Sequence, residues 1–213
     1  MRISLSDCMP ILTMLTQATR VATESQLQTV TALYPNFSLT CSCAIARLLA
    51  SGYLTCDDLA VRVIRLDHPL FRWQPNVPTP DFVWLANALA RRFANAPWRR
   101  TRLYWATPKA VSLVGGSSGL NRQPLQVQHD LCTTEAYLKF LENNTNPDDH
   151  WVGEDALCRI LSRRFRRKRP DAVILREMET PVRIIESGGV YTASALRHNH
   201  RCFMRERIPY ELW

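Results

Sequence analysis

Two short apolar segments near the end of the chain constrain its fold more than any other feature of the sequence. They cover residues 170–175 and 183–189, and a short polar stretch separates them. Short apolar runs bounded by turn residues are typical of buried strands, so the pattern predicts a hairpin. Asp171 stands at the start of the first segment and Glu186 near the end of the second. Two carboxylates at adjacent strand ends form the kind of site that binds a divalent metal.

Gly188 lies where a metal-dependent nuclease of this layout would normally carry a lysine. Because it is two residues beyond Glu186, it shares a strand face with that acid. A cation could instead come from the following helix, where the candidates are Arg197, His198 and Arg201. Two simpler alternatives remain open. In the first, Asp171 is only an acid in the turn that starts the strand. In the second, Gly188 and Gly189 serve only as a turn that needs a positive φ.

The chain is strongly basic. Its 213 residues carry a net charge of +8 and the pI is about 9.4, and arginine supplies nearly all of the positive charge. This balance favours a polyanionic partner, with nucleic acid as the first candidate, because the planar guanidinium group suits phosphate contact. An ordinary basic protein without such a partner is the alternative. The 46% hydrophobic fraction is typical of a globular chain and argues against disorder.

The sequence also predicts a cytoplasmic protein. It contains no run of about 18 apolar residues that would indicate a membrane span, and its first residues lack the apolar core of a secretory signal. Seven cysteines, an odd number at scattered spacings, argue against a disulfide framework. We therefore expect free thiols in a reducing cytosol, no membrane partner and no zinc site.

The first part of the chain has the order of elements found in a winged helix-turn-helix. Helical periodicity predicts three helices, over residues 5–15, 23–34 and 38–51. Gly52 is the candidate C-cap of the third helix, and a turn at 57–58 leads to an alternating strand over 59–66. In that fold the third helix lies in the DNA major groove and the hairpin contacts the backbone. A plain three-helix structural unit is the alternative.

Polar and basic residues in this part supply candidate DNA contacts. Arg47 and Ser42 are expected on the outer surface of the third helix, and Arg62 and Arg65 in the wing. A further helix is predicted over 81–94, and a basic loop follows it. The candidates in that region are Arg91, Arg92, Arg99 and Arg100.

A second basic cluster lies close to the apolar hairpin. Its dense positive charge favours phosphate contact, although a solvated helix end is the simpler alternative. The candidate contacts are Arg163, Arg164, Arg166, Arg167 and Lys168.

The stretch from Gly115 to Pro124 is the clearest linker in the sequence. It divides the chain into residues 1–116, a linker at 117–124, and residues 125–213. The last part reads as helix, helix, strand, strand, helix and strand, with Thr133 as the cap of its first helix and a second helix over 156–165. The prediction is an α/β (α+β) chain with two domains. His129-Asp130 is expected to be a cap and packing pair, since no nucleophile accompanies it.

Four short motifs in the last part resemble the replication-relaxation family. They are Val127-Gln128-His129-Asp130-Leu131, Trp151-Val152-Gly153-Glu154, Pro170-Asp171-Ala172 and Ile185-Glu186. Proteins of this family are associated with plasmids and mobile elements, and they join an N-terminal winged helix to a C-terminal domain like the PD-(D/E)xK nucleases. The resemblance implies this fold here, with catalytic acids at Glu154, Asp171 and Glu186. In an active enzyme such acids bind Mg²⁺, and a lysine positions the attacking water and stabilises the charged transition state.

The sequence therefore predicts a DNA-binding protein of a plasmid or mobile-element replication or mobilisation system, with double-stranded DNA as its partner. Gly188 argues against an active enzyme, so Mg²⁺ at Asp171 and Glu186 is expected only if the site is active. Two rivals stay open. One is a metal-dependent DNA endonuclease with a displaced cation, and the other is a protein-interaction subunit of a replication or mobilisation complex. A homodimer also stays open.

Overall fold

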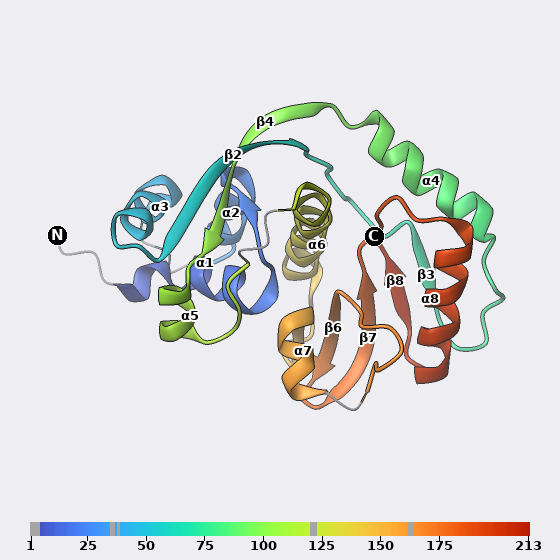
Figure 1. The fold of residues 1–213 in the computed structure, drawn as a ribbon. Coiled ribbons are helices and arrows are strands. Elements are labelled where there is room, and N and C mark those ends of the chain that lie inside the picture. Colours follow the sequence, from blue (N-terminus) through green and yellow to red (C-terminus); the bar gives the residue numbers. More distant parts are fainter. Residues whose placement is uncertain (1–4, 35–36, 38, 120–122, 162–163) are drawn as a thin grey trace.

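A computed structural model describes residues 5–34, 37, 39–119, 123–161 and 164–213 of the chain (Figure 1). Helices and strands are mixed, which confirms the expected α/β class. The strands form one sheet of three strands and one of five. Helix α6 (Pro124–Asn143) lies between the elements around the smaller sheet and those around the larger one. We call these two groups the first unit and the second unit.

The first unit is built on a sheet of order β1–β4–β2, and its long strands β2 and β4 pair in an antiparallel ladder from Leu54↔Ala106 to Arg62↔Trp98. Short helices pack against this ladder (Figure 1). The elements are η1 (Leu5–Cys8), α1 (Met9–Thr13), η2 (Met14–Ala18), β1 (Ala22–Thr23), α2 (Glu24–Ala32), α3 (Cys41–Ala50), β2 (Leu54–Arg62), β4 (Trp98–Ala106) and α5 (Pro108–Val114).

Local sequence explains most boundaries in the first unit. Thr23 caps α2 and Thr40 caps α3, because each hydroxyl accepts a backbone N–H of the first turn. Gly52 follows α3 with φ +69°, as expected of a glycine just past a helix end. The predicted turn at 57–58 is wrong, because both aspartates lie inside β2 and pair with Leu103 and Arg102 of β4.

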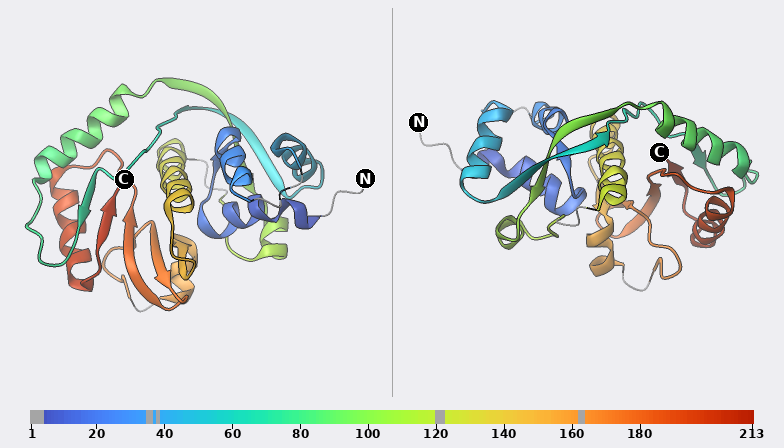
Figure 2. Two further views of the ribbon diagram at one scale, coloured as in Figure 1. Left: turned by 180° about the vertical axis from the view of Figure 1, so that it is seen from behind. Right: turned by 45° about the horizontal axis from the view of Figure 1, so that its top comes forward.

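The segment between β2 and β4 leaves the first unit and joins the second. It contains β3 (Phe71–Trp73) and α4 (Phe82–Asn95), so the predicted helix over 81–94 is confirmed. The Asp81 carboxylate accepts the first N–H groups of α4. β3 pairs with the last strand of the chain, and α4 packs against α8. Figure 2 shows the resulting arch, in which β4 and the chain that follows β2 pass over α6 to reach the second unit.

The second unit is built on a sheet of order β3–β8–β7–β6–β5. Strands β5, β6 and β7 form an antiparallel meander, and β8 returns through α8 to lie parallel to β7. The predicted hairpin and final strand are confirmed, whereas β5 was not predicted. The elements are β5 (Asp149–Gly153), α7 (Glu154–Ile160), β6 (Ala172–Arg176), β7 (Thr180–Glu186), α8 (Ala193–Glu206) and β8 (Tyr210–Leu212).

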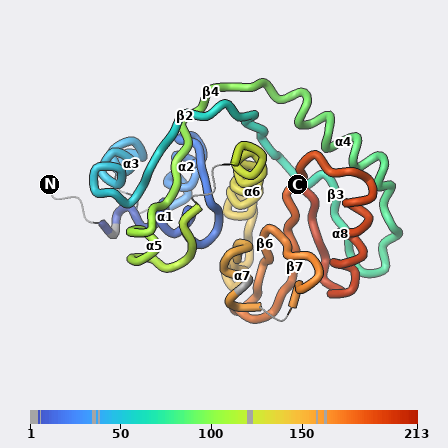
Figure 3. Tube along the Cα trace, in the orientation of Figure 1, coloured from blue at the N-terminus to red at the C-terminus, as the bar shows by residue number. Residues whose placement is uncertain are grey.

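Helix α6 contacts both units, and its sequence explains why (Figure 3). Val127 and Leu131 pack on the first sheet, while Ala136 packs on the second. A helix that is buried on several sides lacks a clear polar face, and this hid its true length. The predicted cap at Thr133 is wrong: the helix begins at Pro124, and the Thr133 hydroxyl bonds the carbonyl of His129 within it.

Candidate functional site

The two predicted acids stand at neighbouring strand ends, as the hairpin requires. Asp171 directly precedes β6, and Glu186 is the last residue of β7. Ala172 pairs with Ile185 across the two strands, so the acids continue the same ladder by one step. Both carboxylates are buried. The hairpin thus brings together two groups that repel each other unless each gains a partner.

Glu186 gains its partners from three directions. Lys168 Nζ lies 3.0 Å from each of its carboxylate oxygens. Asn199 of α8 donates to Glu186 Oε1 at 3.0 Å, and the Tyr191 hydroxyl donates to the same atom at 3.2 Å. The exposed fraction of Glu186 is only 1%. Its carboxylate is therefore fully occupied by donors of the same chain.

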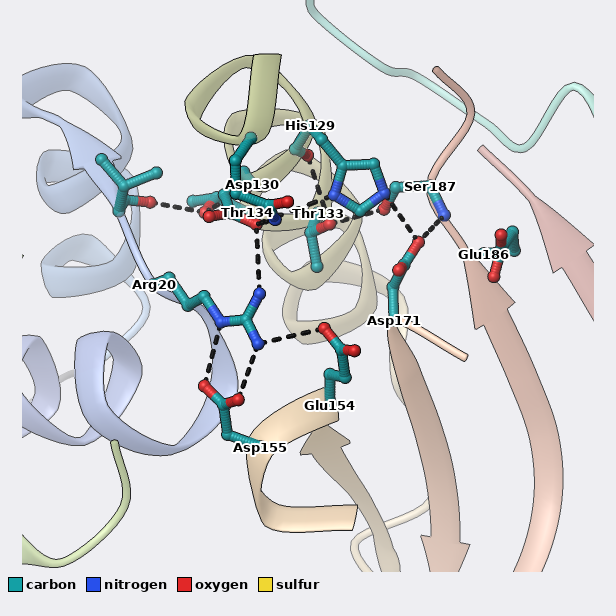
Figure 4. Close-up of polar contacts among 12 residues, drawn as sticks. Arg20, His129, Asp130, Thr133, Thr134, Glu154, Asp155, Asp171, Glu186 and Ser187 are labelled. Carbon is teal, nitrogen blue, oxygen red and sulfur yellow. Dashed lines mark hydrogen bonds and ion pairs between the residues drawn. The ribbon is translucent and has the colours of Figure 1, made fainter. Parts of the chain in front are cut away.

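Asp171 is held by a histidine and by the backbone (Figure 4). His129 Nε2 lies 3.1 Å from Asp171 Oδ2, and the Ser187 N–H donates to the same oxygen at 2.6 Å. The Ser187 hydroxyl bonds Thr133 at 2.7 Å. His129 was predicted to be a packing residue, and its contact with Asp171 gives it a further electrostatic role.

Glu154, the third predicted acid, belongs to a network that centres on Arg20 (Figure 4). Arg20 follows η2 in the first unit, and its guanidinium group points into the second. It lies 3.0 Å from Glu154 Oε2, 2.6 Å from Asp155 Oδ1 and 3.7 Å from Asp130 Oδ1. Each predicted catalytic acid therefore has a resident basic partner: Arg20 for Glu154, His129 for Asp171 and Lys168 for Glu186.

The pKa shifts follow from burial and from these pairs. Burial opposes the charged form of Asp171, but the charge and hydrogen bond of His129, the charge of Lys168 and the Ser187 N–H together outweigh it and lower the Asp171 pKa. Burial likewise opposes protonated His129, but the adjacent carboxylates raise its pKa well above the usual value. Burial and the charge of Asp171 raise the pKa of Glu186 to about 8, although Lys168 opposes this. The cluster is thus largely neutralised from within.

The acids as arranged do not fit a divalent metal. In the part of the chain that the structure describes, no three His, Cys, Asp or Glu side chains lie close enough to hold one. Both Glu186 oxygens and one Asp171 oxygen are already engaged. The cavity beside Asp171 and Glu154 measures about 30 Å³, which is room for about one water molecule. It is too small for a nucleotide.

Packing explains why residue 188 is glycine. A Cβ atom there would lie 2.2 Å from Leu89 Cδ2 and 2.5 Å from the Trp213 carbonyl oxygen. The Gly188 N–H donates to that same carbonyl at 2.6 Å. Helix α4 therefore occupies the space that a lysine side chain would need. Neither Gly188 nor Gly189 has a positive φ, so the alternative of a turn that needs one is wrong.

The predicted substitute cations do not reach the acids. Arg197 lies over the ring of Phe82 at 5.5 Å, and His198 Nε2 lies 3.6 Å from Cys202 Sγ, while Arg201 is exposed. The cation comes instead from Lys168, which was assigned to DNA. Its place three residues before Asp171 was the only sequence signal, whereas Arg20 carried none because its partners lie far along the chain.

Neither predicted DNA contact on α3 is both exposed and free of a partner in the chain. Ser42 is exposed, but its hydroxyl donates to Glu24 at 3.2 Å. Arg47 is half-buried, and its charge acts on the Cys8 thiol of η1. The remaining exposed residues of α3 are small, namely Cys43, Ala46 and Ala50.

The arch carries more of the predicted contacts. Arg65, Arg91, Arg99 and Arg100 are exposed. Arg62 is half-buried, lies over the Trp98 ring at 4.9 Å and donates to the Phe93 carbonyl. Arg92 is also half-buried, and burial lowers its pKa.

The second basic cluster also contains both exposed residues and residues that are paired within the chain. Arg166 and Arg167 are exposed, whereas Arg164 pairs with Glu206 at 3.0 Å and Lys168 with Glu186. Arg163 lies outside the described residues.

Cysteine side chains that the structure describes are all free, as expected. No helix within the described ranges combines the length and apolar character needed to cross a membrane. Comparison of the chain with protein-family models, with curated proteins and with solved structures finds no match. The resemblance to the replication-relaxation family therefore rests on the four sequence motifs.

Proposed function

We propose that the protein binds double-stranded DNA in a plasmid or mobile-element replication or mobilisation system, and that its nuclease-like second unit is not catalytic. In this account the first unit is a winged helix with β2 and β4 as its wing. In the same account the second unit, in which β8 returns through α8 to lie parallel to β7, is a PD-(D/E)xK-like domain. Cytoplasmic location and the family assignment belong to the same proposal.

One observation carries the non-catalytic part of the proposal: each acid of the candidate site is paired with a basic side chain of the same chain. Lys168, His129 and Arg20 occupy the positions beside Glu186, Asp171 and Glu154. A metal would have to displace charge-assisted bonds, which are among the strongest in proteins, and the acids of two of them, Asp171 and Glu186, are buried. The endonuclease rival is therefore the less favoured account.

Unpaired arginines support the DNA-binding part. Arg99 and Arg100 of β4 are exposed, and so are Arg166 and Arg167. Among the described residues, no hydrogen bond or ion pair joins these four to another side chain. Arg100 acts on Asp58 only through its charge. Arginines that no ion pair engages are free to bind phosphates.

We expect a fluorescently labelled duplex to bind the protein at low salt and to be released as salt rises. Each neutralised phosphate contributes about 0.9 to the slope of log affinity against log salt. Anisotropy titrations at several salt concentrations measure that slope. Absence of binding at low salt would instead favour the protein-interaction rival. An affinity that does not change with salt concentration would contradict phosphate contact.

A further inference from the structure

The outer face of α8 carries a row of arginines that are not among the predicted DNA contacts. Arg197, Arg201 and Arg205 recur every four residues and are exposed. Residues at this spacing lie on one face of a helix. The opposite face is buried through Leu196 and Phe203. The row is therefore fixed in direction by the packing of the helix.

The loop after α7 places further positive charge beside this row. A hollow of about 460 Å³ separates the loop from α8. Its lining residues are Phe165, Arg166, Arg167, Lys168, Cys202, Arg205 and Glu206. Glu206, the acid in this lining, is paired with Arg164 at 3.0 Å. The hollow thus presents a strongly positive surface.

The loop is anchored rather than free, which argues against a merely solvated helix end. Phe165 is buried in the core of the second unit and adopts a left-handed backbone conformation with φ +57°. Lys168 is tied to Glu186 and Pro170 is buried. Between these anchors Arg166 and Arg167 face solvent. A loop that is anchored at both ends loses less entropy when its side chains bind a ligand than a mobile loop does.

We propose that α8 and residues 164–169 form a second binding site for the phosphate backbone of duplex DNA, here called the α8 site. The eight helical steps from Arg197 to Arg205 span about 12 Å, which matches roughly three to four phosphates along one strand. The inference rests on the proposed DNA-binding function and deepens it. It assigns backbone contact to the second unit, next to the acid cluster that Lys168 neutralises.

The chemistry favours nucleic acid over a lipid surface. The charged groups are arginines, whose forked donors bind phosphate in two places at once. A helix that lies on a membrane needs a broad exposed apolar face. On α8 the large exposed apolar side chain is Met204 alone, among the residues that the structure describes. Backbone contact without base contact also predicts binding that is independent of DNA sequence.

The test compares two double variants that remove the same charge. Arg201→Gln with Arg205→Gln changes the α8 site. Arg72→Gln with Arg176→Gln is the control for net charge, because both arginines are exposed and lie away from the α8 site, on β3 and β6. Each of them also loses an ion pair, with Glu211 and Asp149 respectively. We expect the α8 variant to weaken binding of a random duplex about tenfold and to lower the salt slope by about 2. The control should change affinity less than about twofold and leave the slope as it was. Circular dichroism and melting curves check that both variants fold.

Each result decides the inference. Equal weakening by the two variants would show that net charge alone matters, and unchanged binding by the α8 variant would exclude the site while the proposed function stands. A wild-type protein that binds no duplex would overturn both. Tighter binding to phosphatidylserine vesicles than to duplex would overturn the choice of ligand.

Discussion

Replacement of Gly188 by alanine is expected to destabilise the protein by about 1–3 kcal/mol, because overpacking a full site forces its neighbours to move. The added Cβ would overlap a methyl group of Leu89 and the backbone carbonyl of Trp213. The carbonyl belongs to the chain end beside β8 and cannot simply change rotamer. Gly188→Lys should be worse, since it adds a long side chain and a buried charge. Chemical denaturation of purified variants measures both effects.

Gly189→Ala provides the matched control for this prediction. Nothing lies within 4 Å of a Cβ atom at that position, so stability should change by less than about 0.5 kcal/mol. If Gly188→Ala is as stable as Gly189→Ala, the site can accept a side chain. The lysine of a nuclease would then be absent for a reason other than packing.

Replacement of Arg20 by methionine is expected to cost about 2–3 kcal/mol. The substitution leaves the carboxylates of Asp155, Glu154 and Asp130 without their common cation, and Asp130 among them is buried, so its unpaired charge is costly. The value is set below that of a fully buried pair because Arg20 is 24% exposed. Because Arg20 belongs to the first unit and its partners Glu154 and Asp155 to the second, the substitution should also weaken the contact between the two units.

Arg102→Met is the control for Arg20→Met. Arg102 pairs with a single acid, Asp58, and both side chains are largely accessible to water. Exposed pairs contribute about 0–1 kcal/mol, so this variant should resemble the wild type in denaturation. Equal stability of the two variants would mean that Arg20 does not hold the units together.

Local patterns in the sequence predicted the elements that depend on nearby residues. The Asp81 cap and the apolar face of α4 led to the correct helix. The two short apolar runs, with a polar stretch between them, led to β6 and β7. The proximity of Asp171 and Glu186 followed from the hairpin alone. Contacts between residues close in sequence leave a pattern that can be recognised.

Contacts between distant residues escaped prediction for a physical reason. Arg20 meets Asp155 across a sequence separation of 135 residues, and nothing near either residue indicates the other. Lys168 meets Glu186 across 18 residues, and the chain just before it has a positive φ at Phe165, which is unusual for an aromatic residue. The length of α6 was hidden because both units bury it. The partners of the acids were therefore visible only in the folded chain.

The most direct test of the account incubates the protein with supercoiled plasmid at low salt, in EDTA and in Mg²⁺ or Mn²⁺. The account predicts retarded but intact plasmid in every buffer, because the candidate metal ligands Asp171 and Glu186 already hold His129 and Lys168. Metal-dependent nicking that disappears in both Asp171→Ala and Glu186→Ala would contradict it. Such a result would establish the endonuclease with a displaced cation, for which Lys168 beside Glu186 is the candidate.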